Sequence, residues 1–273
     1  MGRSYKDIKY DLWYNLAKLG ILPGDIALAY KLQAGTISFD LSINKQHGAQ
    51  AGPVFKKNGL FFDGNNDIIT IPSDSRLFNP GTNDYTILSK AKRSSTGAWH
   101  TIFSRRSSAN NQGVGLRFTH RDAVSMWAGD GAAFGMNDGK TYSADKIYNV
   151  SGTRSGNTLK TYVDGVETGS STATLGNVDT SGIDAFLGVN TDDAMSGYFS
   201  GYIYHVIVVN KLLTPAQIFA VSNIDPFAPR PDITYFETGS TILPIKFTFN
   251  TDEMSKGVGP VTASQLGGLL VGG

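Results

Sequence analysis

The sequence contains no cysteine, which excludes disulfides, iron–sulfur clusters and thiolate zinc sites. Its 24 basic and 23 acidic residues nearly cancel, and the net charge of +1 gives no field that would hold nucleic acid or an anionic membrane. No apolar run approaches the ~20 residues of a membrane span or the apolar stretch of a signal peptide. We therefore expect a soluble protein without a conventional export signal.

The residues that are abundant favour β-structure. There are 32 glycines, 12 tyrosines and 15 phenylalanines, and Asn, Asp, Ser and Thr cluster between short apolar runs. Such runs, separated by turn residues, predict a sandwich of many short strands. The strands expected from alternation are Ile26–Lys31, Leu60–Phe62, Ile68–Ile71, Tyr85–Ala91, His100–Arg105, Val114–Thr119, Val124–Ala128, Ile147–Thr153, Leu159–Val163, Ala185–Val189 and Tyr202–Val209.

Two local patterns are more specific. Asp164-Gly165 predicts a two-residue type I′ hairpin turn, because both central positions of that turn need a positive φ. After the last predicted strand, Thr214 fits the N-cap of a short helix, Pro215 its first position, and Gln217 the capping box.

The two ends differ from the middle, so we divide the chain into residues 1–24, 25–223 and 224–273. Residues 1–24 carry apolar side chains at helical spacing, which predicts a short helical arm that docks on its own domain or on a partner. Residues 224–273 begin with IDPFAPRPD, contain one strand-like segment, Ile242–Asn250, and end rich in Gly. We expect this to be an extended tail.

Five segments in order resemble one family. The segments are FDLSINKQHGAQ, with Asp40, Ser42, Asn44, His47 and Gly48, then GLFFDGNNDIITIP, TLKTYVDGVETG, AFLGVN and FSGYIYHVIVVNKLLTPAQI. They resemble laminin-G-like, concanavalin A-like lectin/glucanase domains. The resemblance implies an all-β, jelly-roll sandwich of two antiparallel sheets. The exit sequence, residues 223–230, is similar to the segment found directly after such domains in tailed-phage virion proteins.

Hydrolases of this fold take two carboxylates from one strand, and glycoside hydrolysis with retention needs them about 5 Å apart. The chain has only three glutamates, Glu167, Glu237 and Glu253, and none lies in such a motif. No predicted strand presents two aspartates at alternating positions. We therefore predict a protein that is not an enzyme.

Sugar binding needs an aromatic ring together with polar groups on a rim loop. Trp99 with the loop of residues 107–112 meets this requirement, and so does Trp127 together with Asp130 and Asn137. Core packing explains Trp127 equally well, because it ends an alternating strand. These four residues are the candidate ligand-binding residues.

A metal site is suggested by Asp63, Asn65 and Asp67, whose oxygens alternate as calcium ligands would. The alternative is a hairpin turn, because Asp, Gly and Asn tolerate positive φ. Calcium is the only cofactor that the sequence suggests. The four histidines lack metal-ligand spacing. His205 shares a predicted strand face with Ile203 and Ile207, which favours a buried core histidine.

These observations together predict a non-enzymatic phage virion structural protein, as a capsid decoration, fibre or tail component, assembled in the host cytoplasm. Both ends would anchor it to other virion proteins, and it would form a homo-oligomer. Host glycans are the expected ligand of the lectin-like sandwich. The alternatives are a carbohydrate-binding module of a secreted or cell-surface protein and, further off, a glycoside hydrolase.

Overall fold

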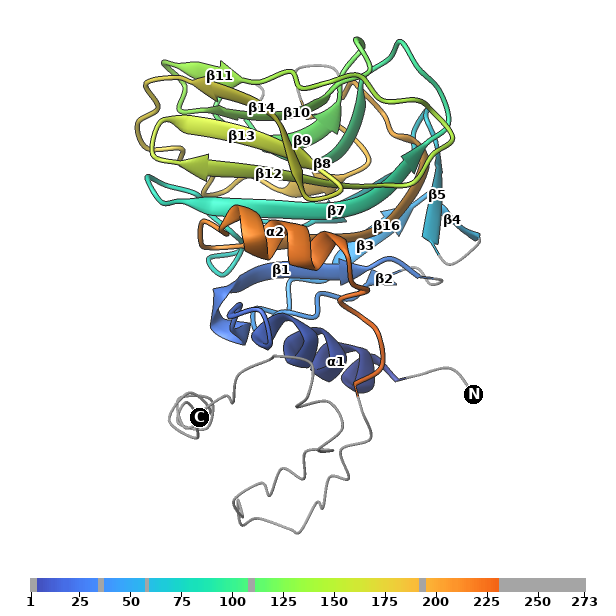
Figure 1. Cartoon of the computed structure of the whole chain (residues 1–273). Coiled ribbons are helices and arrows are strands. Elements are labelled where there is room, and N and C mark those ends of the chain that lie inside the picture. Colours follow the sequence, from blue (N-terminus) through green and yellow to red (C-terminus); the bar gives the residue numbers. More distant parts are fainter. Residues whose placement is uncertain (1–3, 34–36, 57–58, 108–110, 192–194, 231–273) are drawn as a thin grey trace. The chain divides into compact units, whose positions relative to one another are not determined.

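The computed structural model describes residues 4–33, 37–56, 59–107, 111–191 and 195–230. Within these residues two antiparallel sheets stack on a shared core, which confirms the predicted all-β sandwich (Figure 1). The first sheet runs in the order β14-β13-β12-β7-β16-β5-β4, with β1 paired to β16, and the second in the order β11-β10-β9-β8-β15-β6-β3-β2. The predicted segment Ile242–Asn250 lies outside the described residues.

The strands of the first sheet are β1 (Ile26–Lys31), β4 (Val54–Lys56), β5 (Gly59–Asp63), β7 (Tyr85–Arg93), β12 (Tyr148–Ser155), β13 (Thr158–Val163), β14 (Val166–Thr172) and β16 (Ser200–Val209). Those of the second are β2 (Ile37–Ser38), β3 (Gly48–Ala51), β6 (Ile68–Ile71), β8 (His100–Arg106), β9 (Gly113–Phe118), β10 (Val124–Gly129), β11 (Phe134–Met136) and β15 (Ala185–Leu187). The helices are α1 (Tyr5–Ala17), the 3₁₀ turn η1 (Pro23–Asp25) and α2 (Pro215–Ser222).

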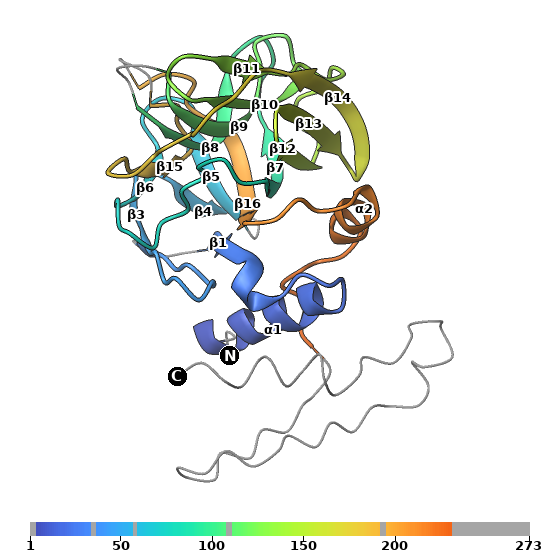
Figure 2. The same cartoon turned by 90° about the vertical axis from the view of Figure 1, so that its left-hand side faces the viewer.

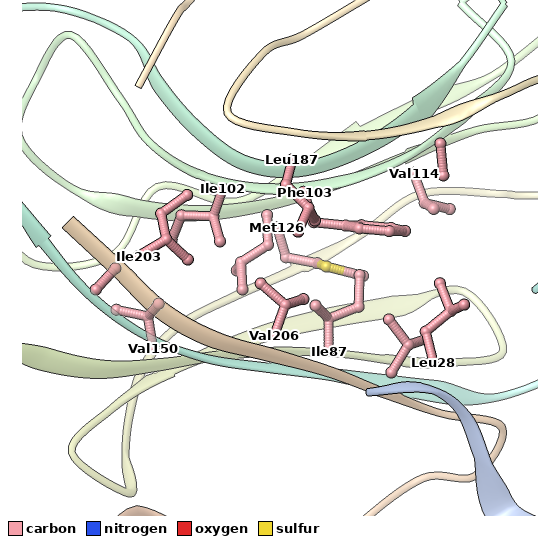
Figure 3. Packing of buried hydrophobic residues seen from close by; sticks show 14 of the residues in the cluster. Leu28, Ile87, Ile102, Phe103, Val114, Met126, Val150, Leu187, Ile203 and Val206 are labelled. Atoms are coloured by element: carbon pink, nitrogen blue, oxygen red, sulfur yellow. The ribbon is translucent and has the colours of Figure 1, made fainter. Parts of the chain in front are cut away.

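The core between the sheets is built from alternate residues of facing strands. Figure 3 shows Ile87 and Val206 of the first sheet pointing toward Met126 and Leu187 of the second. All four side chains are buried, at 0% exposure. The alternation that predicted the strands therefore also selects the residues that hold the sheets together.

The two local sequence signals are confirmed. Asp164 and Gly165 have φ values of 49° and 80° and join β13 to β14, as the predicted hairpin turn requires. Thr214 caps α2 through the Gln217 amide, with Pro215 at the helix start and a complete capping box. Both signals are fixed by a few adjacent residues, so they can be recognised without knowledge of the fold.

A second apolar cluster lies on the outer face of the first sheet, beneath the two helices. Leu12 and Leu16 of α1 meet Ile207 of β16 and Ile218 of α2, and all are buried. Figure 1 and Figure 2 show both helices on this side of the sandwich. The N-terminal helix thus docks on its own domain and belongs to the compact unit that ends at Pro229, rather than forming a separate arm.

One expectation about β16 is wrong. The pairing of β16 with β7 shifts register between Ile203 and His205. Because a bulge changes which face later residues use, Ile203 packs between the sheets while Ile207 packs beneath the helices. His205 therefore shares a face with Ile207 but not with Ile203. It is buried, as predicted, with its ring 5.3 Å from that of Phe227.

No helix among the described residues is long and apolar enough to cross a membrane.

Candidate functional site

Two hollows of about 500 and 220 Å³ meet at Trp99 and Gly197, which line both. We call them together the Trp99 cleft. The larger is also lined by Asp63, Gly64, Ser95, Gly97, Ala98, His100, His120, Tyr198 and Ser200. The smaller is also lined by Thr101, Arg106, Arg117, Asn190 and Ser196. The cleft thus gathers side chains from both sheets and from three loops around a single indole ring.

The indole of Trp99 is partly exposed and is held by its neighbours. The Arg117 guanidinium carbon lies 4.0 Å from the centroid of the ring, within range of a cation–π contact. The His120 ring lies 4.7 Å away, tilted by 52°. Trp99 is therefore oriented by two partners and still reaches the cleft.

The loop before Trp99 is held by an ion pair between a buried arginine and a partly exposed aspartate. The Arg93 side chain has no exposed surface and donates to Asp122 over 2.5 Å, while the same carboxylate oxygen accepts from the Gly97 amide over 2.9 Å. Burial alone would raise the pKa of Asp122, but the Gly97 and Arg93 hydrogen bonds outweigh it and hold that pKa below its usual value. A charged pair thus positions one wall of the cleft.

His100 supports the opposite wall. Its Nδ1 accepts from the Ser200 amide over 3.2 Å, so Nε2 carries the proton and faces Ser95 Oγ at 3.3 Å. Burial, followed by the nearby charge of Arg93, lowers the pKa of His100 below its usual value. The ring is therefore a neutral hydrogen-bonding link between two segments of the cleft.

The outer face of the second sheet is polar where Thr101 and Arg117 line the smaller hollow. Thr101, Arg117 and Ser125 stand directly opposite one another on β8, β9 and β10. Thr101 and Ser125 have no exposed surface, and neither hydroxyl has a hydrogen-bond partner among the described residues. Since buried hydroxyls normally have partners, the Thr101 hydroxyl is an unsatisfied group at the edge of the hollow, but with no exposed surface it cannot contact a ligand in this conformation.

Of the four predicted ligand-binding residues, only Trp99 lines the cleft. Trp127 is 1% exposed, and its ring stacks on that of Phe134 at 5.9 Å, with the Arg106 guanidinium 5.5 Å away. Gly115 makes room for the indole, because a Cβ there would lie 2.4 Å from Trp127 Nε1. Trp127 is thus buried, but on the outer face of the second sheet and in neither apolar core cluster.

The other two candidates serve the backbone. Asn137 is 3% exposed, accepts from the Met126 amide and donates to the carbonyls of Leu159 and Gly169. Asp130 accepts from three backbone amides, those of Ala132, Ala133 and Gly176. Hydrogen bonds from Ala133 and Gly176 are the main reason that the pKa of Asp130 is lowered. The structure therefore does not bring Asp130 and Asn137 into the cleft.

The predicted calcium ligands form the turn between β5 and β6. Asp67 is 6% exposed and accepts from the Asp63 amide over 2.7 Å, and Asp63 accepts from the Asn65 amide over 2.8 Å. Burial raises the pKa of Asp67. Among the described residues, no three His, Asp or Glu side chains form a group that could hold a metal ion. The alternative interpretation, a hairpin turn, is wrong in its pairing: β5 and β6 belong to different sheets, so this turn links the two sheets, and only Gly64 in it has a positive φ.

Comparison with known proteins bears on the whole sandwich. A family model described as the concanavalin A-like lectin/glucanases superfamily matches residues 63–219. No curated protein matches the chain.

Several solved structures share the fold. Trypanosoma rangeli sialidase in complex with sialic acid is 17% identical, with a TM-score of 0.57 over 73% of this chain and 33% of that one. The botulinum neurotoxin serotype D binding domain is 15% identical, with a TM-score of 0.60 over 76% and 52% of the two chains. The binding domain of Paraclostridial Mosquitocidal Protein 1 is 12% identical, with a TM-score of 0.58 over 74% and 52%. The chain thus spans about a third to a half of these structures, and the likeness shows a shared fold.

Proposed function

The chain belongs to the concanavalin A-like lectin/glucanase superfamily, and from this membership we propose that it binds carbohydrate in the Trp99 cleft without cleaving it. The observation that carries the proposal is the position of Trp99, a partly exposed indole where two polar-lined hollows meet. An aromatic face takes the C–H face of a sugar ring, and nearby polar groups take its hydroxyls. Ser196, which is exposed, supplies such a group beside Trp99, and the buried Asn190 lines the same hollow.

Sialylated glycans are the first ligands to test. The sialidase of similar fold is described in complex with sialic acid, and two further similar structures are binding domains of toxins. Because these structures share little sequence identity with the chain, they support only the choice of sialylated glycans as the first probe. The ligand of this chain is then identified by experiment.

The carboxylates of the cleft support binding without cleavage. Asp63 is the only acidic residue among the described residues that line either hollow, whereas most glycoside hydrolases use two carboxylates. Sialidases with a tyrosine nucleophile are an exception, and Tyr198 lines the larger hollow. Incubation with sialyllactose is the direct check: we expect no free sialic acid, and its release above a heat-inactivated control would contradict this part of the proposal.

The binding experiment uses a glycan array with the wild-type chain and Trp99→Ala. We expect Trp99→Ala to lose at least tenfold in affinity for the glycan that binds best, which corresponds to about 1.4 kcal/mol. Phe219→Ala is the matched control, because this aromatic ring is 54% exposed on α2, outside the cleft. Equal binding by the wild type and Trp99→Ala would refute the proposal.

We also propose a virion as the setting, with the sandwich displayed as a capsid decoration, fibre or tail component. The support is the resemblance of residues 223–230 to phage virion sequences. Because the apolar side of α1 is buried on its own sandwich, attachment to other virion proteins or self-association would use other surfaces. Immunogold labelling of purified phage particles is the test, and absence of the chain from particles would refute the setting but not the sugar site.

A further inference from the structure

The outer face of the first sheet has two halves with different chemistry. The two helices and Phe227 cover one half with aliphatic contacts. The other half is formed by β4, β5, the start of β16 and the end of β7, and Figure 1 and Figure 2 both show α2 well away from β4. This second half carries Phe61, Tyr202 and Tyr204, all partly exposed, with Lys56 and Lys92 beside them. We call these five residues the aromatic–lysine face.

The strand register aligns the face. Val54, Phe61, Tyr202 and Lys92 stand directly opposite one another on four neighbouring strands, so their side chains share one side of the sheet. The rings of Phe61 and Tyr202 are 5.2 Å apart, and the rings of Tyr202 and Tyr204 are 6.2 Å apart and nearly parallel, at 16°. A continuous run of three rings results.

A glycine completes the run. The ring of Tyr204 lies over Gly59, where an added Cβ would come within 2.8 Å of it. Any larger residue at this position would displace Tyr204 from its place beside Tyr202. The aromatic run therefore depends on a strand residue that has no side chain.

The cations belong to the same surface. Lys56 Nζ lies 4.4 Å from the centroid of Phe61, and Lys92 Nζ lies 5.8 Å from that of Tyr202. Lys92 also pairs with Asp145 over 3.1 Å, but the Asp145 side chain is 69% exposed, and such surface pairs contribute little. Both ammonium groups can therefore reach an anionic ligand that lies over the rings.

We propose that the aromatic–lysine face binds an acidic polysaccharide, at a site separate from the Trp99 cleft. The three rings receive the C–H faces of consecutive sugar units, and Lys56 and Lys92 receive their carboxylates. A nucleic acid fits less well, because its binding depends on many phosphate contacts and the chain has a net charge of only +1. The proposal does not rest on a function for the Trp99 cleft.

The test measures binding of the full chain to polygalacturonate, with dextran as the neutral control. We expect polygalacturonate to bind, its affinity to fall as salt rises, and dextran to bind at least tenfold more weakly. The double variant K56Q/K92Q should lose at least tenfold in affinity, and Tyr202→Ser should lose a similar factor. Tyr202→Ser alters packing. If it proves less stable than the wild type in thermal unfolding, the lysine variant decides, because it removes the two charges and keeps most of each side chain.

Trp99→Ala should leave polygalacturonate binding unchanged, which separates this site from the cleft. No binding of polygalacturonate, or equal binding by K56Q/K92Q and the wild type, would overturn the proposal. Stronger binding of single-stranded oligothymidylate than of polygalacturonate would overturn it too, and would assign the face to nucleic acid. None of these results would bear on sugar binding at Trp99.

Discussion

The outer faces of the two sheets carry side chains of different chemistry. Half of the first sheet's outer face is sealed by α1 and α2 with aliphatic side chains, among them Leu12 and Ile207. The outer face of the second sheet around β8–β10 instead carries Thr101, Arg117 and Ser125. Covering one face with apolar helices adds buried apolar area and hence stability, whereas the polar side chains of the other face add little. Mutations on the two faces should therefore differ in how strongly they change the free energy of unfolding.

The largest effect is expected at the sealed face. Leu12→Ala removes a side chain with no exposed surface from between α1 and the sheet, and should lower the free energy of unfolding by about 2–5 kcal/mol. Urea unfolding monitored by tryptophan fluorescence measures the loss. Leu22→Ala is the control, because Leu22 is 46% exposed, and a change within about 0.5 kcal/mol is expected for it. A loss below about 1 kcal/mol for Leu12→Ala would show that the helix contributes little.

The second effect depends on pH and also concerns the sealed face. Burial lowers the pKa of His205 to about 3, with Asp225 opposing the shift and Lys90 and Lys31 adding to it. The unfolded chain has a histidine pKa near 6.5, so the neutral ring costs nothing above that pH. As the pH falls from 6.5 toward 3, the unfolded chain alone takes up the proton, and stability drops by about 1.4 kcal/mol per pH unit.

At pH 5 this loss is about 2 kcal/mol relative to pH 7. The measurement compares the free energies of unfolding of the wild type and His205→Gln at both pH values, and the variant should lack this part of the dependence. Equal pH dependence in both proteins would mean that His205 is already accessible to protons in the folded state.

Most of the fold could be predicted because its signals are local. Alternation placed eleven of the sixteen strands that the described residues form, with Ile26–Lys31 and Ile68–Ile71 matched to the residue, and the Asp164-Gly165 turn needs only its own two residues. The bulge before His205 could not be predicted, because it depends on how β16 pairs with β7. The register between strands far apart in sequence cannot be recognised from the sequence of either strand alone.

The site was only partly predictable, for the same reason. Trp99 and Trp127 were both candidates, and what separates them is a glycine on the neighbouring strand, Gly115, and the ring of Phe134. Thr101 was missed, although its strand was predicted. Nothing in the alternation of that strand says that its outward face borders a hollow.

The smallest effect tests the polar outer face of the second sheet. Thr101→Val and Thr119→Val make the same exchange at two side chains with no exposed surface, but the Thr119 hydroxyl accepts from the amides of Arg121 and Ala123, while that of Thr101 has no partner among the described residues. Thr119→Val should therefore cost about 1 kcal/mol in unfolding free energy, and Thr101→Val close to nothing. Urea unfolding of both variants measures the difference. An equal loss of stability in both variants would mean that the Thr101 hydroxyl contributes as much to the fold as that of Thr119.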